Sequence, residues 1–202
     1  RVDILGRERG RLTGLLRSSN VRVLDASSVY ESPAHAALVE SVLARGAALE
    51  TLRLGGYRTL LTDERVLQYY EGRDNPFPLA RIIEKYSPRV LGAERGTPCI
   101  FEYQGQPIGY MQYYPLTDAD KRAYGYDASV DVAGVFGIDL FIGEPEYWER
   151  GIGTRAVKAL LTYLFETKQA RKVVLDPETW NTRAIRCYEK CGFRKARLLP
   201  QH

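Results

Sequence analysis

Hydrophobic and polar positions follow a clear order only in the second half of the chain. Two apolar stretches, at 98–103 and 107–114, flank the polar residues 104–106 and predict a β-hairpin. A longer apolar stretch at 130–142 carries glycines, which are typical of a bulge or a close backbone approach. The remaining elements are expected as a helix at 154–167, a strand at 171–175, a helix at 182–190 and a strand at 193–198. This order predicts a mixed α/β or α+β sheet with helices on its faces.

The first 56 residues give weaker patterns than the rest of the chain. A helix is expected at 34–43. The first strand is expected either at 11–16 or at 52–54, and the sequence leaves both open. Two further helices are expected, one through residue 69 with Thr62 or Asp63 as its cap, and one at 79–86.

Length and composition indicate one domain with a substantial core, because the chain has 202 residues and 45% of them are hydrophobic. No apolar run approaches the roughly 20 residues needed to cross a bilayer. The net charge of +4 comes from scattered residues, which is not a nucleic-acid-binding pattern. Three cysteines, Cys99, Cys187 and Cys191, are too few for a disulfide framework, and no histidine lies near them in the sequence. We therefore expect no metal site and a reducing, cytoplasmic location.

One stretch departs from the average charge. Residues 125–149 contain six acids and no Lys or Arg. A local acidic field of this kind attracts polycations even when the total charge is positive. A solvated acidic loop is the alternative interpretation, and the sequence leaves both open.

A glycine-rich turn, residues 147–154, follows the apolar stretch and precedes the predicted helix at 154–167. A strand, a glycine turn and a helix together offer backbone N–H groups and a helix N-terminus to a phosphate. Gly151 and Gly153 would let the main chain approach the anion closely. A helix that only packs on a strand would need the same turn. This pattern alone therefore does not distinguish a phosphate-binding turn from a structural one.

A second motif covers residues 176–193 and begins where the strand at 171–175 ends. Asn181 is a favoured helix N-cap and Gly192 a favoured helix stop. The short helix between them carries one tyrosine, Tyr188, on its last turn.

These two segments resemble the acetyl-coenzyme A site of the GNAT acetyltransferase superfamily. The narrower resemblance is to the aminoglycoside 6′-N-acetyltransferases and covers about residues 61–200. It is carried by residues 61–67, 70–74, 107–110, 137–139, 141–145 and 176–193. Trp148 departs from the superfamily pattern, which has Arg or Gln at this position of the glycine turn.

The resemblance implies a single acetyltransferase domain over residues 1–202, with a GNAT-like sheet. That sheet is central, mostly antiparallel and flanked by helices, and its central strands splay to admit acetyl-coenzyme A. Residues 1–56 match the family poorly. In the family, one further strand follows the strand that begins near residue 193 and pairs with it. We expect this final strand to be missing here.

Transfer of an acetyl group to an amine requires a neutral amine, although an amine with a pKa of about 10 is mostly protonated at neutral pH. Asp139 lies within an apolar stretch, where an unpaired carboxylate is costly to bury, so we expect it to bind or deprotonate the amine. A structural hydrogen-bonding role is the alternative. The resemblance makes Tyr188 the acid that protonates the leaving thiolate, and the alternative is a core aromatic residue.

The resemblance also assigns binding residues. The expected cofactor-binding residues are Phe141, Ile142, Arg150, Gly151, Ile152, Gly153, Thr154 and Asn181. The expected substrate-binding residues are Tyr70, Glu71, Tyr114, Asp139 and Asp176.

The predicted function is acetyl transfer from acetyl-coenzyme A to the 6′-amino group of aminoglycosides, which confers resistance. An acetyltransferase for protein N-termini or other small amines, and a non-catalytic acyl-coenzyme A-binding module, are the alternatives. The expected partner is a small molecule, with neither nucleic acid nor membrane. The sequence leaves homodimerisation open.

Overall fold

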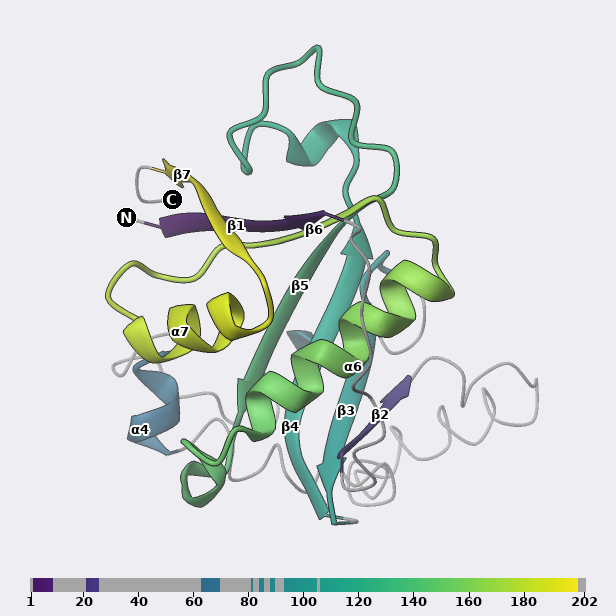
Figure 1. Cartoon of the computed structure of the whole chain (residues 1–202). Coiled ribbons are helices and arrows are strands. Elements are labelled where there is room, and N and C mark those ends of the chain that lie inside the picture. The colour runs from purple at the N-terminus through teal and green to yellow at the C-terminus, as the bar shows by residue number, and fades with distance from the viewer. Residues whose placement is uncertain are drawn as a thin grey trace, which may run out of the picture. The chain divides into compact units, whose positions relative to one another are not determined.

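The structure is a computed structural model of the 202-residue chain (Figure 1). It describes residues 2–8, 21–25, 63–69, 81, 84–85, 88–89, 93–104 and 106–199. The chain divides into two compact units. Unit 1 comprises Arg1–Ser19, Tyr113–Asp139 and Gly151–His202, and unit 2 comprises Asn20–Gln112 and Leu140–Arg150.

Unit 1 is built around a parallel strand pair. Strand β5 (Val135–Ile142) is followed by helix α6 (Ile152–Glu166) and strand β6 (Lys172–Leu175). The pairs Val135↔Lys172, Phe136↔Val173 and Gly137↔Val174 join β5 and β6 in parallel. A parallel pair needs such a crossover, which the helix provides.

Two antiparallel strands continue the sheet beyond β6. Strand β1 (Val2–Glu8) pairs with β6 on one side and with β7 (Arg194–Leu199) on the other. Helix α7 (Thr182–Lys190) precedes β7 and contacts α6 (Figure 1).

The apolar face of α6 supplies the core of unit 1. Ala156, Val157, Leu160, Leu161 and Leu164 are each at most 1% exposed. Their spacing places them on one stripe of a helix, so burial of this stripe fixes the rotation of α6.

Unit 2 contains strand β2 (Val21–Asp25) antiparallel to β3 (Thr97–Tyr103), which is followed by β4 (Gln106–Pro115). Strand β4 neighbours β3 and β5, and both β4 and β5 run from one unit into the other. Helix α4 (Glu64–Leu67) begins after Asp63, whose carboxylate accepts a hydrogen bond from the backbone N–H of Arg65 at 2.8 Å. Two short 3₁₀ helices complete the elements, η2 (Asp118–Asp120) in unit 1 and η3 (Pro145–Tyr147) in unit 2.

The predicted fold class is confirmed: the sheet combines the antiparallel pairs β1–β6, β1–β7 and β2–β3 with the parallel pair β5–β6, and helices flank it. The hairpin at 98–103 and 107–114 is confirmed, and helix α7 has the predicted bounds of 182–190.

Three boundaries were wrong. Strand β5 begins at Val135 instead of residue 130, because Gly134 has a left-handed φ of 70° and Asp131 caps the N–H of Ala133. Helix α6 begins at Ile152, two residues before the expected start. Helix α4 ends at Leu67 and does not reach residue 69.

The N-terminal predictions have a different outcome. The helix expected at 34–43 and both candidates for the first strand, 11–16 and 52–54, lie outside the described residues. Strands β1 and β2 were not predicted. The place beside β7, where the family's final strand was expected, is taken by β1.

Within the described ranges, no helix is both long and apolar enough to span a membrane. The same residues contain no group of three or more His, Cys, Asp or Glu side chains that could hold a metal ion.

Candidate active site at the ends of the parallel strands

Asp139 lies within β5, and Asp176 directly follows the last residue of β6. The parallel register aligns Gly137 with Val174, and Asp139 and Asp176 each follow this last aligned pair by two residues. Ligands of open α/β sheets commonly bind outside the carboxyl ends of parallel strands. Both side chains are half-buried, so the two carboxyl groups stand where a ligand could reach them.

The two carboxyl groups interact electrostatically. Burial, together with the negative charge of Asp139, raises the pKa of Asp176 to about 7. Two like charges at one site disfavour simultaneous ionisation, and a bound cation relieves that penalty. The pair therefore has the electrostatic character of an ammonium site.

Tyr188 faces the same negative charges. It is 8% exposed, and its ring packs edge-to-face on Phe193 with centroids 6.1 Å apart. Burial, followed by the charges of Cys187, Asp139 and Asp176, raises the pKa of its hydroxyl. Tyr188 is consequently neutral at physiological pH and can act as a proton donor.

Helix α7 holds Tyr188 in place through caps at both ends. Asn181 accepts the backbone N–H of Ala184 at 3.1 Å, and Gly192 has a left-handed φ of 87°. The N–H of Phe193 donates to the carbonyl of Tyr188 at 3.1 Å, which completes a Schellman-type stop. Because the Asn181 side-chain oxygen serves as the cap, its amide nitrogen is the group left to carry the predicted cofactor role.

Tyr114 is positioned by a hydrogen bond that the sequence did not indicate. Its hydroxyl lies 2.7 Å from that of Tyr124, which is 6% exposed. A Cβ at Gly137 would lie 2.4 Å from the Tyr114 ring, so the absence of a side chain there makes room for that ring. Burial and the charge of Asp139 raise the pKa of Tyr114. Sequence reasoning missed Tyr124, whose signal was an aromatic residue within an otherwise polar loop.

The glycine turn ends at the first turn of α6. Gly151 is the N-cap residue with φ 69°, and a Cβ there would meet no atom within 4 Å. The first i to i−4 bond of the helix joins the N–H of Arg155 to the carbonyl of Gly151. The N–H groups of Ile152, Gly153 and Thr154 precede that bond and lack helical acceptors, as at every helix start. Ile152 is 1% exposed, so only its backbone could serve a ligand.

The remaining predicted cofactor residues belong to unit 2. Phe141 and Ile142 are half-buried on the last part of β5, and the ring of Phe141 lies 5.7 Å from that of Tyr110. The guanidinium of Arg150 lies 5.7 Å from the ring centroid of Tyr147. Trp148 donates its indole N–H to the carbonyl of Ile142 at 2.9 Å, so this departure from the superfamily pattern has a structural role.

Two predicted substrate residues, Tyr70 and Glu71, lie outside the described residues.

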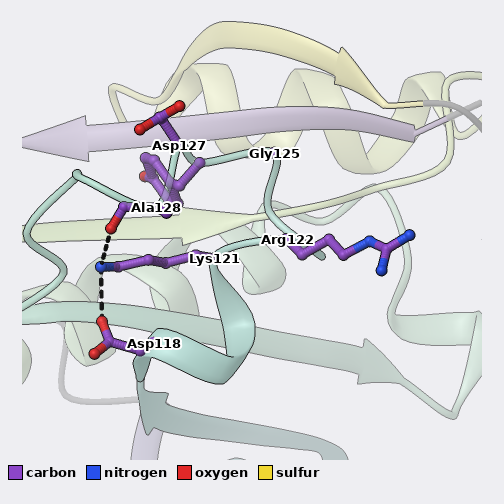
Figure 2. A pocket seen from close by; sticks show the side chains of 7 residues that line it. Asp118, Lys121, Arg122, Gly125, Asp127 and Ala128 are labelled. Carbon is purple, nitrogen blue, oxygen red and sulfur yellow. Dashed lines mark hydrogen bonds and ion pairs between the residues drawn. The ribbon is translucent and has the colours of Figure 1, made fainter.

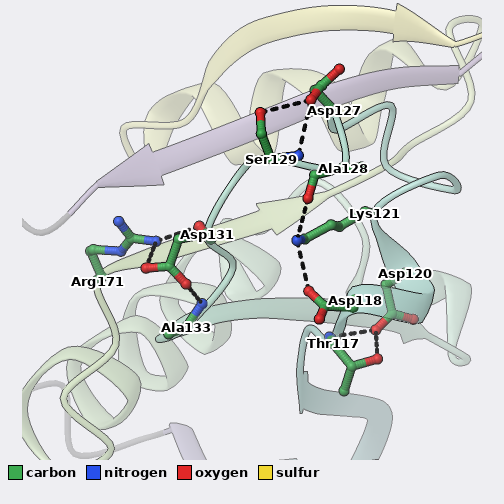
Figure 3. A network of polar contacts seen from close by, with 10 residues as sticks. All are labelled: Thr117, Asp118, Asp120, Lys121, Asp127, Ala128, Ser129, Asp131, Ala133 and Arg171. Atoms are coloured by element: carbon green, nitrogen blue, oxygen red, sulfur yellow. Dashed lines mark hydrogen bonds and ion pairs between the residues drawn. The ribbon is translucent and has the colours of Figure 1, made fainter.

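The loop between β4 and β5 accounts for part of the acidic stretch. Asp127 accepts hydrogen bonds from the N–H and hydroxyl of Ser129, and Asp131 accepts from Ala133 and pairs with Arg171 (Figure 3). Lys121 bridges Asp118 and the carbonyl of Ala128 (Figures 2 and 3). Asp127 and Asp131 therefore stabilise the loop, as the solvated-loop interpretation expected.

A pocket of about 720 Å³ lies in this loop (Figure 2). It is lined by Asp118, Lys121, Arg122, Gly125, Tyr126, Asp127 and Ala128. None of the predicted site residues lines it.

Comparisons with known proteins identify the family of this chain. Residues 61–200 match the family model described as an acetyltransferase (GNAT) domain. The chain belongs to the GNAT acetyltransferase family. The family predicted from the sequence is thus confirmed.

Individual GNAT proteins and solved structures are also similar to this chain. The chain is 37% identical over 135 residues to the aminoglycoside N(6′)-acetyltransferase type 1 of Klebsiella pneumoniae, covering 67% of this chain and 66% of that protein. A structure of AAC(6′)-Ib with ribostamycin and coenzyme A matches with a TM-score of 0.57 and 34% identity, covering 69% and 76% of the two chains. AAC(6′)-Ib with coenzyme A and kanamycin matches with a TM-score of 0.57 and 35% identity, covering 70% and 78%.

The match spans 66% of the length of the type 1 enzymes of Klebsiella pneumoniae and Serratia marcescens.

Proposed function

We propose that this GNAT protein transfers an acetyl group from acetyl-coenzyme A to the 6′-amino group of aminoglycosides, and that this confers resistance to them. The observation that carries the proposal is that Asp139 and Asp176, each two residues beyond the aligned pair Gly137↔Val174, interact electrostatically. The identity of 37% to an aminoglycoside N(6′)-acetyltransferase supports the choice of substrate class.

Asp139 and Asp176 supply the cation site. An aminoglycoside arrives as a polycation, and its reacting ammonium has a pKa near 10. The charges of the two carboxylates attract and orient that ammonium. Asp139 then accepts its proton, directly or through one water, so that the nitrogen lone pair becomes nucleophilic.

Tyr188 supplies the proton that the leaving group requires. Acetyl-coenzyme A, when bound, provides the acetyl group as a thioester. The new bond joins the amine nitrogen to the carbonyl carbon, and the bond that breaks joins that carbon to sulfur. Tyr188 donates its phenolic proton to the departing sulfur, because its raised pKa keeps the hydroxyl protonated until that step.

The glycine turn supplies the expected anion site. Backbone N–H groups at Gly151, Ile152, Gly153 and Thr154 would hold the pyrophosphate, as helix N-termini commonly do. Phe141, Ile142, Arg150 and Asn181 complete the proposed cofactor set, and Tyr70, Glu71 and Tyr114 complete the proposed substrate set.

A thiol-release assay with acetyl-coenzyme A tests the proposal. We expect turnover with 6′-amino aminoglycosides and none with 6′-hydroxy analogues, with mass spectrometry locating the acetyl group on the 6′ nitrogen. Spermidine and a peptide with a free N-terminus are included as competing amine classes. Faster turnover of either would replace the aminoglycoside by that class, and coenzyme binding without any turnover would favour a non-catalytic module.

A further inference from the structure

Two cysteines of α7 meet the first turn of α6 at one residue, Thr154. The Cys187 sulfur lies 3.3 Å from the Thr154 hydroxyl, and the Cys191 thiol donates to the Thr154 carbonyl at 3.5 Å. Both are free thiols, so the structure brings together two sulfurs that are four residues apart and chemically unlinked.

The two thiols differ in access. Cys187 is half-buried, whereas Cys191 is 1% exposed. The neighbouring Cys191 and Thr154 side chains, together with the charge of Lys190, outweigh burial and lower the pKa of Cys187 to about 7. The thiolate is the reactive form of cysteine. A more accessible attacking thiol beside a shielded partner is the arrangement of redox-sensing pairs.

We propose that Cys187 and Cys191 form a redox-sensitive dithiol, in which a peroxide oxidises Cys187 and Cys191 closes a disulfide onto it. In the first step the Cys187 thiolate attacks one peroxide oxygen, the O–O bond breaks, and a sulfenic acid and hydroxide form. In the second step the Cys191 sulfur attacks the Cys187 sulfur, and the hydroxyl group leaves as water with the Cys191 proton. The peroxide is reduced and the two thiols together lose two electrons.

Closing the disulfide has a structural consequence at Thr154. The Cys191 thiol proton is consumed, so its bond to the Thr154 carbonyl is lost, and the Cys187 sulfur turns from the Thr154 hydroxyl toward its new partner. The first turn of α6 then loses side-chain contacts with α7. This consequence rests on the proposed function, in which the turn holds the pyrophosphate of coenzyme A. Loss of one hydrogen bond at the turn should weaken coenzyme A binding roughly fivefold.

The sequence offers a direct test, because trypsin cuts between the two cysteines at Lys190. Reduced protein gives separate peptides 187–190 and 191–194, since Arg186, Lys190 and Arg194 are all cleavage sites. After stoichiometric hydrogen peroxide, we expect these two peptides to appear joined. We also expect the intact mass to fall by about 2 Da, reversibly with a reductant, as disulfide formation requires.

Two variants sharpen the test. Cys191→Ala removes the partner, so Cys187 should gain oxygen mass instead of losing hydrogen. Cys99→Ala, in the other unit, should behave like the unchanged protein. The proposal is overturned if the joined peptides are absent after oxidation, if the disulfide links two chains, or if Cys99→Ala abolishes it.

These mass readouts do not depend on acetyltransferase activity, so they separate this proposal from the proposed function. If the disulfide forms but coenzyme A affinity is unchanged, the consequence inferred for the α6 turn is wrong.

Discussion

At the residue scale, the proposed chemistry rests on single residues, and the sequence singles out those whose type disagrees with their surroundings. Asp139 could be singled out from the sequence because a carboxylate in an apolar strand is costly unless something uses it. Tyr188 could not be assigned in the same way, because a tyrosine on an amphipathic helix is also ordinary core. Tyr124 was missed because an aromatic residue in a loop is not part of any periodic hydrophobic pattern. Only the fold shows that its hydroxyl lies beside that of Tyr114.

Asp139→Asn should reduce turnover by roughly 10²-fold or more, the usual cost of losing a general base. Asparagine keeps the size of the side chain but cannot accept the amine proton, so coenzyme A affinity should change little. Steady-state kinetics and calorimetric binding measure the two effects. Asp131→Asn is the matched control, since Asp131 caps the loop at Ala133 and pairs with Arg171, and its loss should leave turnover unchanged. Near-normal turnover in Asp139→Asn would show that Asp139 is not the general base, and Asp176 would be the next candidate.

Tyr188→Phe should lower turnover less than Asp139→Asn does, by at most about 10²-fold. A thiol of pKa about 8.5 is already a moderate leaving group, so its protonation contributes less than deprotonation of the amine. Phenylalanine preserves the packing on Phe193, so the melting temperature should be nearly unchanged. Tyr163→Phe removes a hydroxyl elsewhere in unit 1 and serves as the control. Full turnover in folded Tyr188→Phe protein would mean that water protonates the thiolate.

Asp176 should make the fold less stable as pH rises. Its pKa is about 7 in the folded protein and 3.8 ordinarily, so the unfolded chain releases this proton first. The contribution of Asp176 to the free energy of unfolding therefore falls between about pH 4 and pH 7. Asp176→Asn removes this penalty, so its stability gain over the unchanged protein should be larger at pH 8 than at pH 5. Urea unfolding at both pH values measures the difference, and an equal gain at both would contradict the raised pKa.

At the scale of elements, prediction succeeded where the determinants were local. Helix α7 has the expected bounds because Asn181 and Gly192 signal its two ends within the segment itself. Strand β5 was placed too long because the apolar run continues through residues 130–134. The turn there depends on Gly134 adopting a left-handed φ and on Arg171 pairing with Asp131 from 40 residues away.

The glycine turn and α6 can be tested as one anion-binding element. Gly153→Val should raise the dissociation constant of coenzyme A, because a branched side chain would crowd the backbone N–H groups proposed to meet the pyrophosphate. Ala159→Val introduces the same side chain further along the same helix, away from the glycine turn, and should leave the affinity unchanged despite its small helix-propensity cost. Isothermal calorimetry compares the two. If both variants fold and bind equally, the pyrophosphate is held elsewhere.

At the scale of the whole molecule, the sequence predicted the family and sheet class but not the partner of every strand. Local periodicity cannot show that residues 2–8 pair with strands that begin more than 160 residues later. The register of β1 supplies that information: Gly6 lies opposite Val174 of β6 and opposite Arg194 of β7. Strand β1 thus lies between β6 and β7 and pairs with both. Strand β6 leads directly into Asp176.

This placement of β1 predicts that the first eight residues contribute to global stability. Gly6→Pro removes a backbone N–H from a strand with neighbours on both sides, which should cost about 1–3 kcal/mol through a lost and unsatisfied hydrogen bond. Gly6→Ala keeps the N–H and is the matched control. The urea midpoint should fall clearly in Gly6→Pro and much less in Gly6→Ala. Equal midpoints for both variants would show that β1 does not pair as described, and β7 would then need a different neighbour.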